Sequence, residues 1–339
     1  MTQFLRKWPC APQRGLRANA IPKFCQRGLT MVELLVALVI SLLIALAAIA
    51  ALTVTRQGFQ TVDAASQLRD NGRFSADLIQ RLAVQSGYKN TWEATIPSTV
   101  PLGPYITGFN NALIKTSDPL NATTTRPTGQ DGFGSDILIL RYQAAETFLN
   151  SGKSDQSMIG CTGNSPTNIA GPMISIIHVA ISQGEPSLMC SYSADGGFSF
   201  TTAQPIVQGV ENFQVLYGTD GVTAGTAPTA TTDAIPDRLL RSDQLTVSGN
   251  ASATDANWRR VRSLRIGMIL RGPLNSAQEK VAQTLYPFGL AKSSSTGTAG
   301  AAMSNTITLD PGTAFTTPAD GRLRQVLTFT VHLRNDQGT

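Results

Sequence analysis

The chain has 339 residues, of which only 14% are Asp, Glu, Lys or Arg. Its formal charge of +5 would suit a protein that binds nucleic acid or an acidic surface, but six basic and no acidic residues fall within the first 28. Removing those six from the 27 Lys and Arg leaves 21, against 22 Asp and Glu. The rest of the chain therefore has no bulk positive charge that would steer it to DNA.

A long apolar run follows the basic segment. Leu29–Leu52 contains one charged residue, Glu33, and as a helix it would be about 36 Å long, enough to cross a hydrocarbon core of about 30 Å. The preceding basic residues predict a cytoplasmic N-terminus, with residues 53–339 on the outer side. An ordinary membrane anchor and a cleaved signal peptide are the simpler alternatives. Neither explains a lone carboxylate at membrane depth.

The start of this run resembles the class III signal of type IV prepilins and pseudopilins, which combines Gly28, an apolar run and Glu33. The resemblance implies that residues 1–28 are a leader, that a dedicated prepilin peptidase cuts between Gly28 and Leu29, and that the new amino group of Leu29 is methylated. It also implies a role for Glu33 in subunit assembly. A carboxylate in hydrocarbon is costly unless paired, and the N-terminal ammonium of a neighbouring subunit is a suitable partner. A protonated Glu33 in a plain anchor is the alternative.

Helical periodicity continues beyond the apolar run and becomes amphipathic. Ser86-Gly87-Tyr88 predicts the end of the helix. We expect one helix from Leu29 to about Ser86, with residues 29–52 in a membrane or fibre core and residues 53–87 packed on a globular head. The apolar residues expected to form the packing stripe are Phe59, Val62, Leu68, Phe74, Leu78, Ile79 and Leu82.

Residues 88–339 alternate short apolar runs with Pro, Gly, Thr, Asn and Ser clusters, which predicts a β-rich head. Residues 91–134 are expected to be irregular, and residues 218–257 and 289–322 to be exposed insertions or partly disordered. Arg260, Arg262 and Leu264 are expected to share one face of a strand, either as a basic patch or as a solvated sheet face. The expected strands are Asp136–Tyr142, Met173–Ile181, Leu188–Tyr192, Gly197–Thr201, Ile206–Tyr217, Val261–Leu270 and Gln325–Leu333.

The number and positions of the cysteines fit a chain whose residues 53–339 lie outside the cytoplasm. Cys10 and Cys25 lie in the leader, which leaves Cys161 and Cys190 on the outer side. In an oxidising compartment these two would form a disulfide closing a loop of roughly 30 residues. Two buried free thiols are the alternative, and the chain has too few cysteines and histidines for a convincing zinc site.

Nothing in the sequence predicts catalysis or a cofactor. His178 and His332 lie in strand-like runs and are expected to be structural, and no nucleophile, P-loop or metalloprotease motif is present. Asp131, Asp136 and Asp195 lie near glycines but do not match the EF-hand spacing. We therefore expect no enzyme activity and no metal.

Four further segments resemble the PilW-type minor pilins of the type IV pilus. They are Ser66–Tyr88, which contains Asn-Gly-Arg-Phe, then Pro205–Asp220, Trp258–Gly272 and Asp320–Asn335. Cys161 and Cys190 also fall where that family often has a cysteine pair. The resemblance implies an α+β, type IV pilin-like fold, in which a long N-terminal helix packs on an antiparallel β-sheet head with long loops.

The same resemblance implies a minor pilin that helps to assemble a type IV pilus, in a tip or assembly-initiating complex. Its partners would be other minor and major pilins, the prepilin peptidase and the pilus assembly platform. It would first be a single-pass inner-membrane protein with a periplasmic head, and then part of the fibre at the cell surface. A J-like pseudopilin of a type II secretion system is one alternative. A tip adhesin or DNA receptor is another, which leaves nucleic acid as an open partner.

Overall fold

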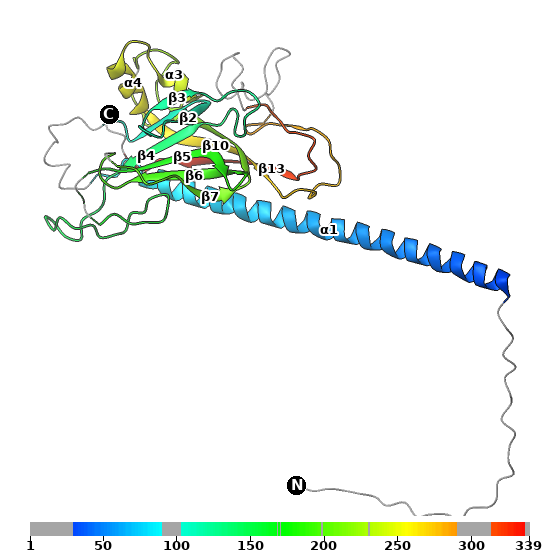
Figure 1. The fold of residues 1–339 in the computed structure, drawn as a ribbon. Coiled ribbons are helices and arrows are strands. Elements are labelled where there is room, and N and C mark those ends of the chain that lie inside the picture. Colours follow the sequence, from blue (N-terminus) through cyan, green and yellow to red (C-terminus); the bar gives the residue numbers. More distant parts are fainter. Residues whose placement is uncertain are drawn as a thin grey trace, which may run out of the picture. The chain divides into compact units, whose positions relative to one another are not determined.

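The structure, a computed structural model, describes residues 30–89, 103–167, 169, 171–197, 199–229, 231–289 and 313–335 (Figure 1). The chain divides into two compact units, residues 1–54 and residues 55–339. Helix α1 (Met31–Gln85) supplies residues to both units. The expected cleavage site at Gly28–Leu29 and the leader cysteines lie outside the described residues.

The long helix predicted from the sequence is confirmed as α1. Its C-terminal end lies where Ser86-Gly87-Tyr88 predicts it, because Gly87 adopts a φ of +80°, a left-handed conformation that glycine takes without steric cost. The N–H of Gly87 then donates to the carbonyl oxygen of Arg141 at 3.0 Å, so the chain leaves the helix already bonded to a strand of the head.

The head contains a five-stranded and a four-stranded sheet, both entirely antiparallel (Figure 1). The first has the order β1 (Ile106–Phe109), β4 (Ile137–Tyr142), β5 (Met173–Ser182), β6 (Glu185–Ser193) and β7 (Gln204–Gln208). The second has the order β13 (Arg324–His332), β10 (Val261–Arg271), β8 (Val210–Thr219) and β9 (Arg238–Leu240). With α1, these sheets confirm the predicted α+β class.

Smaller elements surround the sheets. Two short strand pairs are β2 (Ala112–Ile114) with β3 (Ala122–Thr125), and β11 (Thr284–Leu285) with β12 (Phe315–Thr316). Helices α3 (Ser242–Leu245) and α4 (Ala251–Trp258) follow β9.

Alternation along β4 and β5 explains why the five-stranded sheet is buried on both faces. Successive strand residues point to opposite faces. Leu138, Leu140 and Ile177 join the main core, which also includes residues of the four-stranded sheet and of α1. The intervening residues form a second, smaller core with the β2–β3 segment; its buried members are Ala112, Ile137, Ile139, Ile174 and Ile176.

The strand predictions were right for five segments and wrong for two. The single strand expected over Ile206–Tyr217 is two strands in different sheets, broken at Gly209. That residue has a φ of +84°, and a Cβ there would lie 2.5 Å from the carbonyl oxygen of Arg271. No strand is assigned to the described part of Gly197–Thr201, where Gly197 has a φ of +98° and Asp195 accepts the N–H of Ser199 at 3.0 Å.

The expectation that residues 91–134 are irregular was also wrong, and residues 218–257, expected to be exposed insertions or partly disordered, contain regular elements. The first range contains β1, β2 and β3, and the second contains β9, α3 and most of α4. Asn250 caps α4, since its Oδ1 accepts the N–H of Ala253 at 3.0 Å. Of the range 289–322, residues 290–312 lie outside the described part of the chain.

The packing stripe of α1 also differs from the prediction. Phe59, Val62 and Phe74 are 72%, 70% and 54% exposed. Leu68, Ile79 and Leu82 are buried as expected, but the other buried positions are small residues. From Ala64 to Leu82 the buried positions recur at three- and four-residue steps: Ala64, Leu68, Gly72, Ser75, Ile79 and Leu82, followed by Ala83. The prediction considered only large apolar residues, whereas small residues allow a helix to approach a sheet closely.

Candidate functional site

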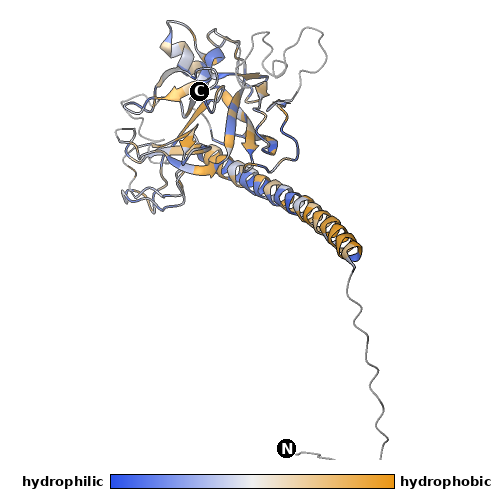
Figure 2. Cartoon of the chain, turned by 45° about the vertical axis from the view of Figure 1, so that its right-hand side comes forward, coloured by the Kyte–Doolittle hydropathy of each residue, from blue (hydrophilic) through white to orange (hydrophobic). Residues whose placement is uncertain are grey.

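The apolar N-terminal part of α1 is the first candidate region. Every described residue of the 30–54 segment is exposed, and Figure 2 shows this part of the helix as hydrophobic. By length and composition, α1 is apolar enough to cross a membrane. An exposed apolar surface of this size requires lipid or other apolar helices to cover it.

Glu33 lies in the first turn of α1. Its backbone N–H donates to Oγ1 of Thr30 at 3.3 Å, and the N–H of Leu34 donates to the carbonyl oxygen of Thr30 at 3.1 Å. Thr30 and Glu33 have the Thr-x-x-Glu spacing of a helix capping box. This local role for Thr30 was missed from the sequence, although the spacing was readable there. It leaves the Glu33 carboxylate exposed.

The Asn-Gly-Arg-Phe segment of α1 positions the helix on the four-stranded sheet. A Cβ on Gly72 would lie 3.4 Å from Cδ2 of Leu327 on β13 and 4.0 Å from Cδ1 of Leu270 on β10. A methyl group at this position would therefore be at ordinary contact distance from both side chains. Phe74 is the exposed member of the segment.

The C-terminal end of α1 is held by a residue almost 250 positions further along the chain. Nδ2 of Asn335 donates to the carbonyl oxygens of Val84 at 3.1 Å, Gln85 at 3.4 Å and Ser86 at 3.1 Å. The last carbonyls of a helix have no partner within the helix. Asn335, which closes the Asp320–Asn335 segment, supplies that partner.

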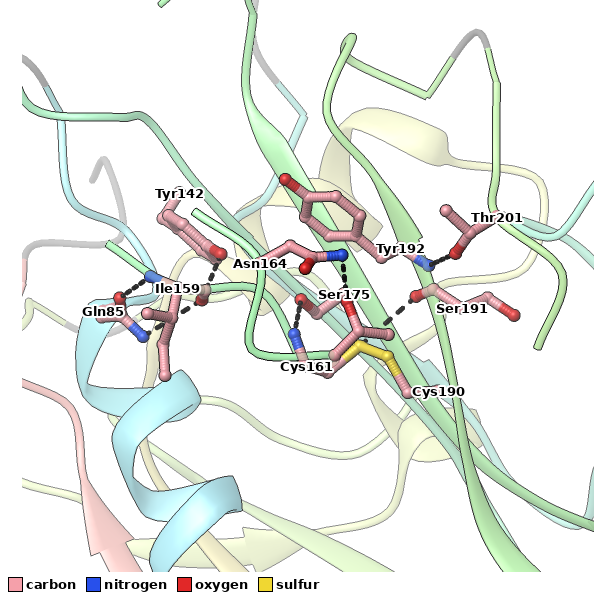
Figure 3. Close-up of a disulfide and its surroundings, with 11 residues drawn as sticks. Gln85, Tyr142, Ile159, Cys161, Asn164, Ser175, Cys190, Ser191, Tyr192 and Thr201 are labelled. Carbon is pink, nitrogen blue, oxygen red and sulfur yellow. Dashed lines mark hydrogen bonds between the residues drawn. A yellow bond between two sulfur atoms is a disulfide. The ribbon is translucent and has the colours of Figure 1, made fainter. Parts of the chain in front are cut away.

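The cysteine pair expected from the sequence forms a disulfide, with a Cα–Cα distance of 6.0 Å between Cys161 and Cys190 (Figure 3). Cys190 lies on β6, and the N–H of Cys161 donates to Oγ of Ser175 on β5 at 3.2 Å. The bond attaches the long β4–β5 connection to the sheet.

The same connection is attached to the end of α1 (Figure 3). Oε1 of Gln85 accepts the N–H of Ile159 at 2.8 Å, and the Tyr142 hydroxyl donates to the carbonyl oxygen of Ile159. The disulfide and these bonds therefore fix one loop to both the sheet and the helix.

A cluster of three carboxylates and three arginines lies beside the start of β13. We call it the carboxylate–arginine cluster, and its members are Glu185, Glu211, Arg271, Asp320, Arg322 and Arg324. It connects β6 of the five-stranded sheet with β8, β10 and β13 of the four-stranded sheet. Sequence reasoning missed it, because its members are up to 139 positions apart and have no common motif.

Charge in this cluster shifts the pKa of its acids. A hydrogen bond from Arg324 holds the pKa of Asp320 below its usual value, although burial opposes this. Burial would raise the pKa of Glu185, but hydrogen bonds from Arg271 and Arg322 outweigh it and leave that pKa lowered. Both acids are therefore stabilised in the ionised form.

The histidines and aspartates considered for catalysis or metal binding are separate from one another. His178 is buried on β5, and burial together with the nearby Arg126 lowers its pKa to about 4, whereas His332 is exposed. Asp136 accepts backbone N–H groups of Asn111 at 3.0 Å and Val215 at 2.8 Å. Within the described ranges, no three His, Cys, Asp or Glu side chains are grouped as metal ligands would be.

The arginines considered as a basic patch do not form a regular stripe. A register shift between Val261 and Ser263 places a bulge at Arg262, so the expected alternation of Arg260, Arg262 and Leu264 on one face is broken. Leu264 is buried, and Arg262 is half-buried with Nη1 bonded to the carbonyl oxygen of Arg259 at 2.8 Å.

Two regions of the chain match known protein families. Residues 178–335 match the family model "Type IV Pilus-assembly protein W" (PilW), and residues 23–49 match the "Prokaryotic N-terminal methylation motif". A search of curated proteins found no match. Among solved structures, the type IV-like pilin TTHA1219 from Thermus thermophilus is similar at 16% identity with a TM-score of 0.38, over 78% of this chain and 96% of that one. That similarity is too distant to carry an argument.

The two family matches contain the class III signal and three of the four PilW-like segments, whereas Ser66–Tyr88 lies outside both. The methylation motif covers the start of α1, and the PilW match runs from β5 to the described end of the head. Together the two matches support a minor pilin of the type IV pilus, with residues 178–335 similar to the PilW family.

Proposed function

We propose that this minor pilin acts by assembly in low copy number, at the pilus tip or in the complex that initiates the fibre, and not by catalytic turnover. The observation that carries the proposal is the pairing of a methylation motif with an apolar helical segment exposed along its whole described length. Such a segment serves first as a membrane anchor and then as a surface for packing against other pilin helices. A large head with long connections would be difficult to repeat along a tightly packed fibre, which supports a terminal position.

In this scheme the prepilin peptidase removes residues 1–28, and Leu29 becomes the methylated N-terminal residue. The head lies in the periplasm before assembly, with the N-terminus at the cytoplasmic side of the inner membrane. Mass spectrometry of the N-terminal peptide tests the cleavage site. Material that retains residues 1–28 in assembled pili, or normal processing of Gly28→Trp, would contradict it.

The Glu33 carboxylate is proposed to pair with the terminal ammonium of a neighbouring subunit and so to set the axial register of the helices. Glu33→Ala should insert and be processed, because removing a charge eases membrane insertion, but should enter pili poorly. Asp63→Ala is the matched control, since Asp63 is an exposed acid on the same helix beyond the apolar run. Equal incorporation of both variants would refute the role of Glu33.

The PilW match over residues 178–335 favours this function over a J-like pseudopilin. Cross-linking in cells should recover other minor pilins, with few copies of this chain per fibre. Even labelling along whole pili, at the density of the major subunit, would exclude a terminal position.

A further inference from the structure

A cleft of about 830 Å³ lies between β1, the β2–β3 segment and the helices α3 and α4. Its volume is within the range of small-ligand sites, about 300–1,000 Å³. None of the roles argued above for α1, the disulfide or the carboxylate–arginine cluster involves it.

The lining of the cleft mixes apolar residues with neutral polar ones. Hydroxyl and amide side chains come from every bounding element: Thr107, Asn110, Asn121, Thr125, Ser242 and Thr254. Apolar ligands select clefts lined mostly by hydrophobic side chains. The mixture here suits a ligand that has both apolar faces and many hydrogen-bonding groups.

Two charged groups of opposite sign, Arg141 and Asp255, line the cleft. Arg141 is half-buried, and its Nη1 donates to the carbonyl oxygen of Pro104 at 3.0 Å and to Oγ1 of Thr107 at 2.8 Å. Burial lowers the pKa of Arg141 to about 10, and the charge of Asp255 partly offsets this. Among the described residues, neither Arg141 nor Asp255 is joined to an oppositely charged side chain within 4.0 Å.

The net charge of the cleft argues against an ionic ligand. Asp243, the third charged residue of the lining, is held by Arg241 through two hydrogen bonds of 2.8 and 2.9 Å. Arg141 and Asp255 then balance each other. An anion would meet Asp255, and a cation would meet Arg141.

We propose that this cleft binds a neutral carbohydrate. Each sugar hydroxyl both donates and accepts, so adjacent hydroxyls can accept from Arg141 and donate to Asp255 at once. The Ser, Thr and Asn side chains supply further partners. Trp258 closes the wall of the cleft and is held edge-to-face against Tyr217, with ring centroids 4.8 Å apart, so the α4 side is rigid. The proposal concerns the head alone and stands or falls independently of pilus assembly.

The test uses the full chain purified in a zwitterionic detergent without a sugar headgroup, since a glycoside detergent would compete for the site. An array of neutral and acidic oligosaccharides identifies the ligand, and calorimetric titration with the bound sugar gives the affinity. We expect binding to neutral sugars. Asp255→Asn should weaken it by about tenfold or more, as expected for losing a hydrogen bond to a charged group.

Glu279→Gln is the control, because it removes the same charge from an exposed carboxylate outside the cleft lining. It should leave the affinity unchanged, and both variants should unfold at the wild-type temperature. Three results would overturn the proposal. They are no binding to any neutral oligosaccharide, equal affinity of the Asp255→Asn variant and wild type, and tighter binding of acidic sugars by Asp255→Asn, which would identify an anionic ligand.

Discussion

Replacing Glu211 by Gln tests whether the carboxylate–arginine cluster holds the head together. The Glu211 side chain is 4% exposed, and its carboxylate accepts from Nη1 of Arg271 at 3.0 Å and from Nε and Nη2 of Arg324 at 2.7 and 3.0 Å. Gln preserves the size of the side chain. It removes the charge, however, and turns one acceptor into an amide donor that faces a guanidinium.

The expected loss of stability depends on which acidic partners Arg271 and Arg324 keep in the variant. Breaking a buried ion pair by removing one partner costs about 3–5 kcal/mol, because the other charge stays buried without compensation. Arg324 keeps Asp320 at 2.7 Å and Arg271 keeps Glu185 at 2.8 Å. We therefore expect the lower end of that range, about 3 kcal/mol. Asp320→Asn should cost less, because Asp320 is 21% exposed and Arg324 still has Glu211.

Denaturant unfolding of the full chain in detergent measures both losses. The midpoint should fall with little change in slope, since the fold is unchanged. Glu279→Gln is again the control, and an exposed substitution of this kind should stay within about 0.5 kcal/mol of wild type. A Glu211→Gln variant as stable as this control would refute the reasoning. So would Asp320→Asn costing more than Glu211→Gln.

Three further predictions concern the same head. Asn335→Asp should lower stability by about 1–3 kcal/mol, because it replaces the donor to three helix-terminal carbonyls with a charge that repels them, and thermal unfolding against Asn164→Asp checks this. Cys161 and Cys190 should be bonded in protein taken from the periplasm, as non-reducing gels would show, and reduction should cost about 3 kcal/mol in the chain-entropy model. Stability should fall in acid: Asp320 and Glu185 have lowered pKa values, so the stability they add is complete above their unfolded pKa values and is lost as pH falls through the folded ones. Unfolding midpoints at pH 7 and pH 3 measure this fall, and Asp320→Asn should reduce it.

The sequence predicted those structural features whose physical cause lies in neighbouring residues. The apolar run, the helix stop at Gly87 and most of the long strands depend on neighbouring residues, and the sequence predicted them. The break at Gly209 depends on the carbonyl of Arg271, 62 positions away, which leaves no room for a Cβ. The segment Ile206–Tyr217, which alternates apolar and polar residues across this glycine, therefore looked like one strand.

The contacts that the sequence did not predict also join residues that are far apart in the chain. Asn335 reaches α1 across almost the whole chain, and Glu211 meets Arg324 across 113 positions. Nothing near either residue shows its partner. The elements within residues 218–257 were missed for a different reason: their Thr, Ala and Ser composition suggests exposed loops, although the Asn250 cap before α4 was a readable local signal.

Thr30 and Glu33 cap the start of α1, and Glu33 also has the proposed role in subunit assembly. In a protein cut after Gly28, Thr30 would be the second residue and α1 would begin almost at the new N-terminus. Glu33 would then lie in the first helical turn, where the exposed N–H groups favour a negative charge. From that position the carboxylate could pair with an ammonium from another subunit. Thr30→Ala should therefore weaken assembly less than Glu33→Ala, because it removes the hydroxyl that accepts the Glu33 N–H but keeps the charge. Equal defects in pilus incorporation would mean that the Thr-x-x-Glu pair matters only as a helix cap.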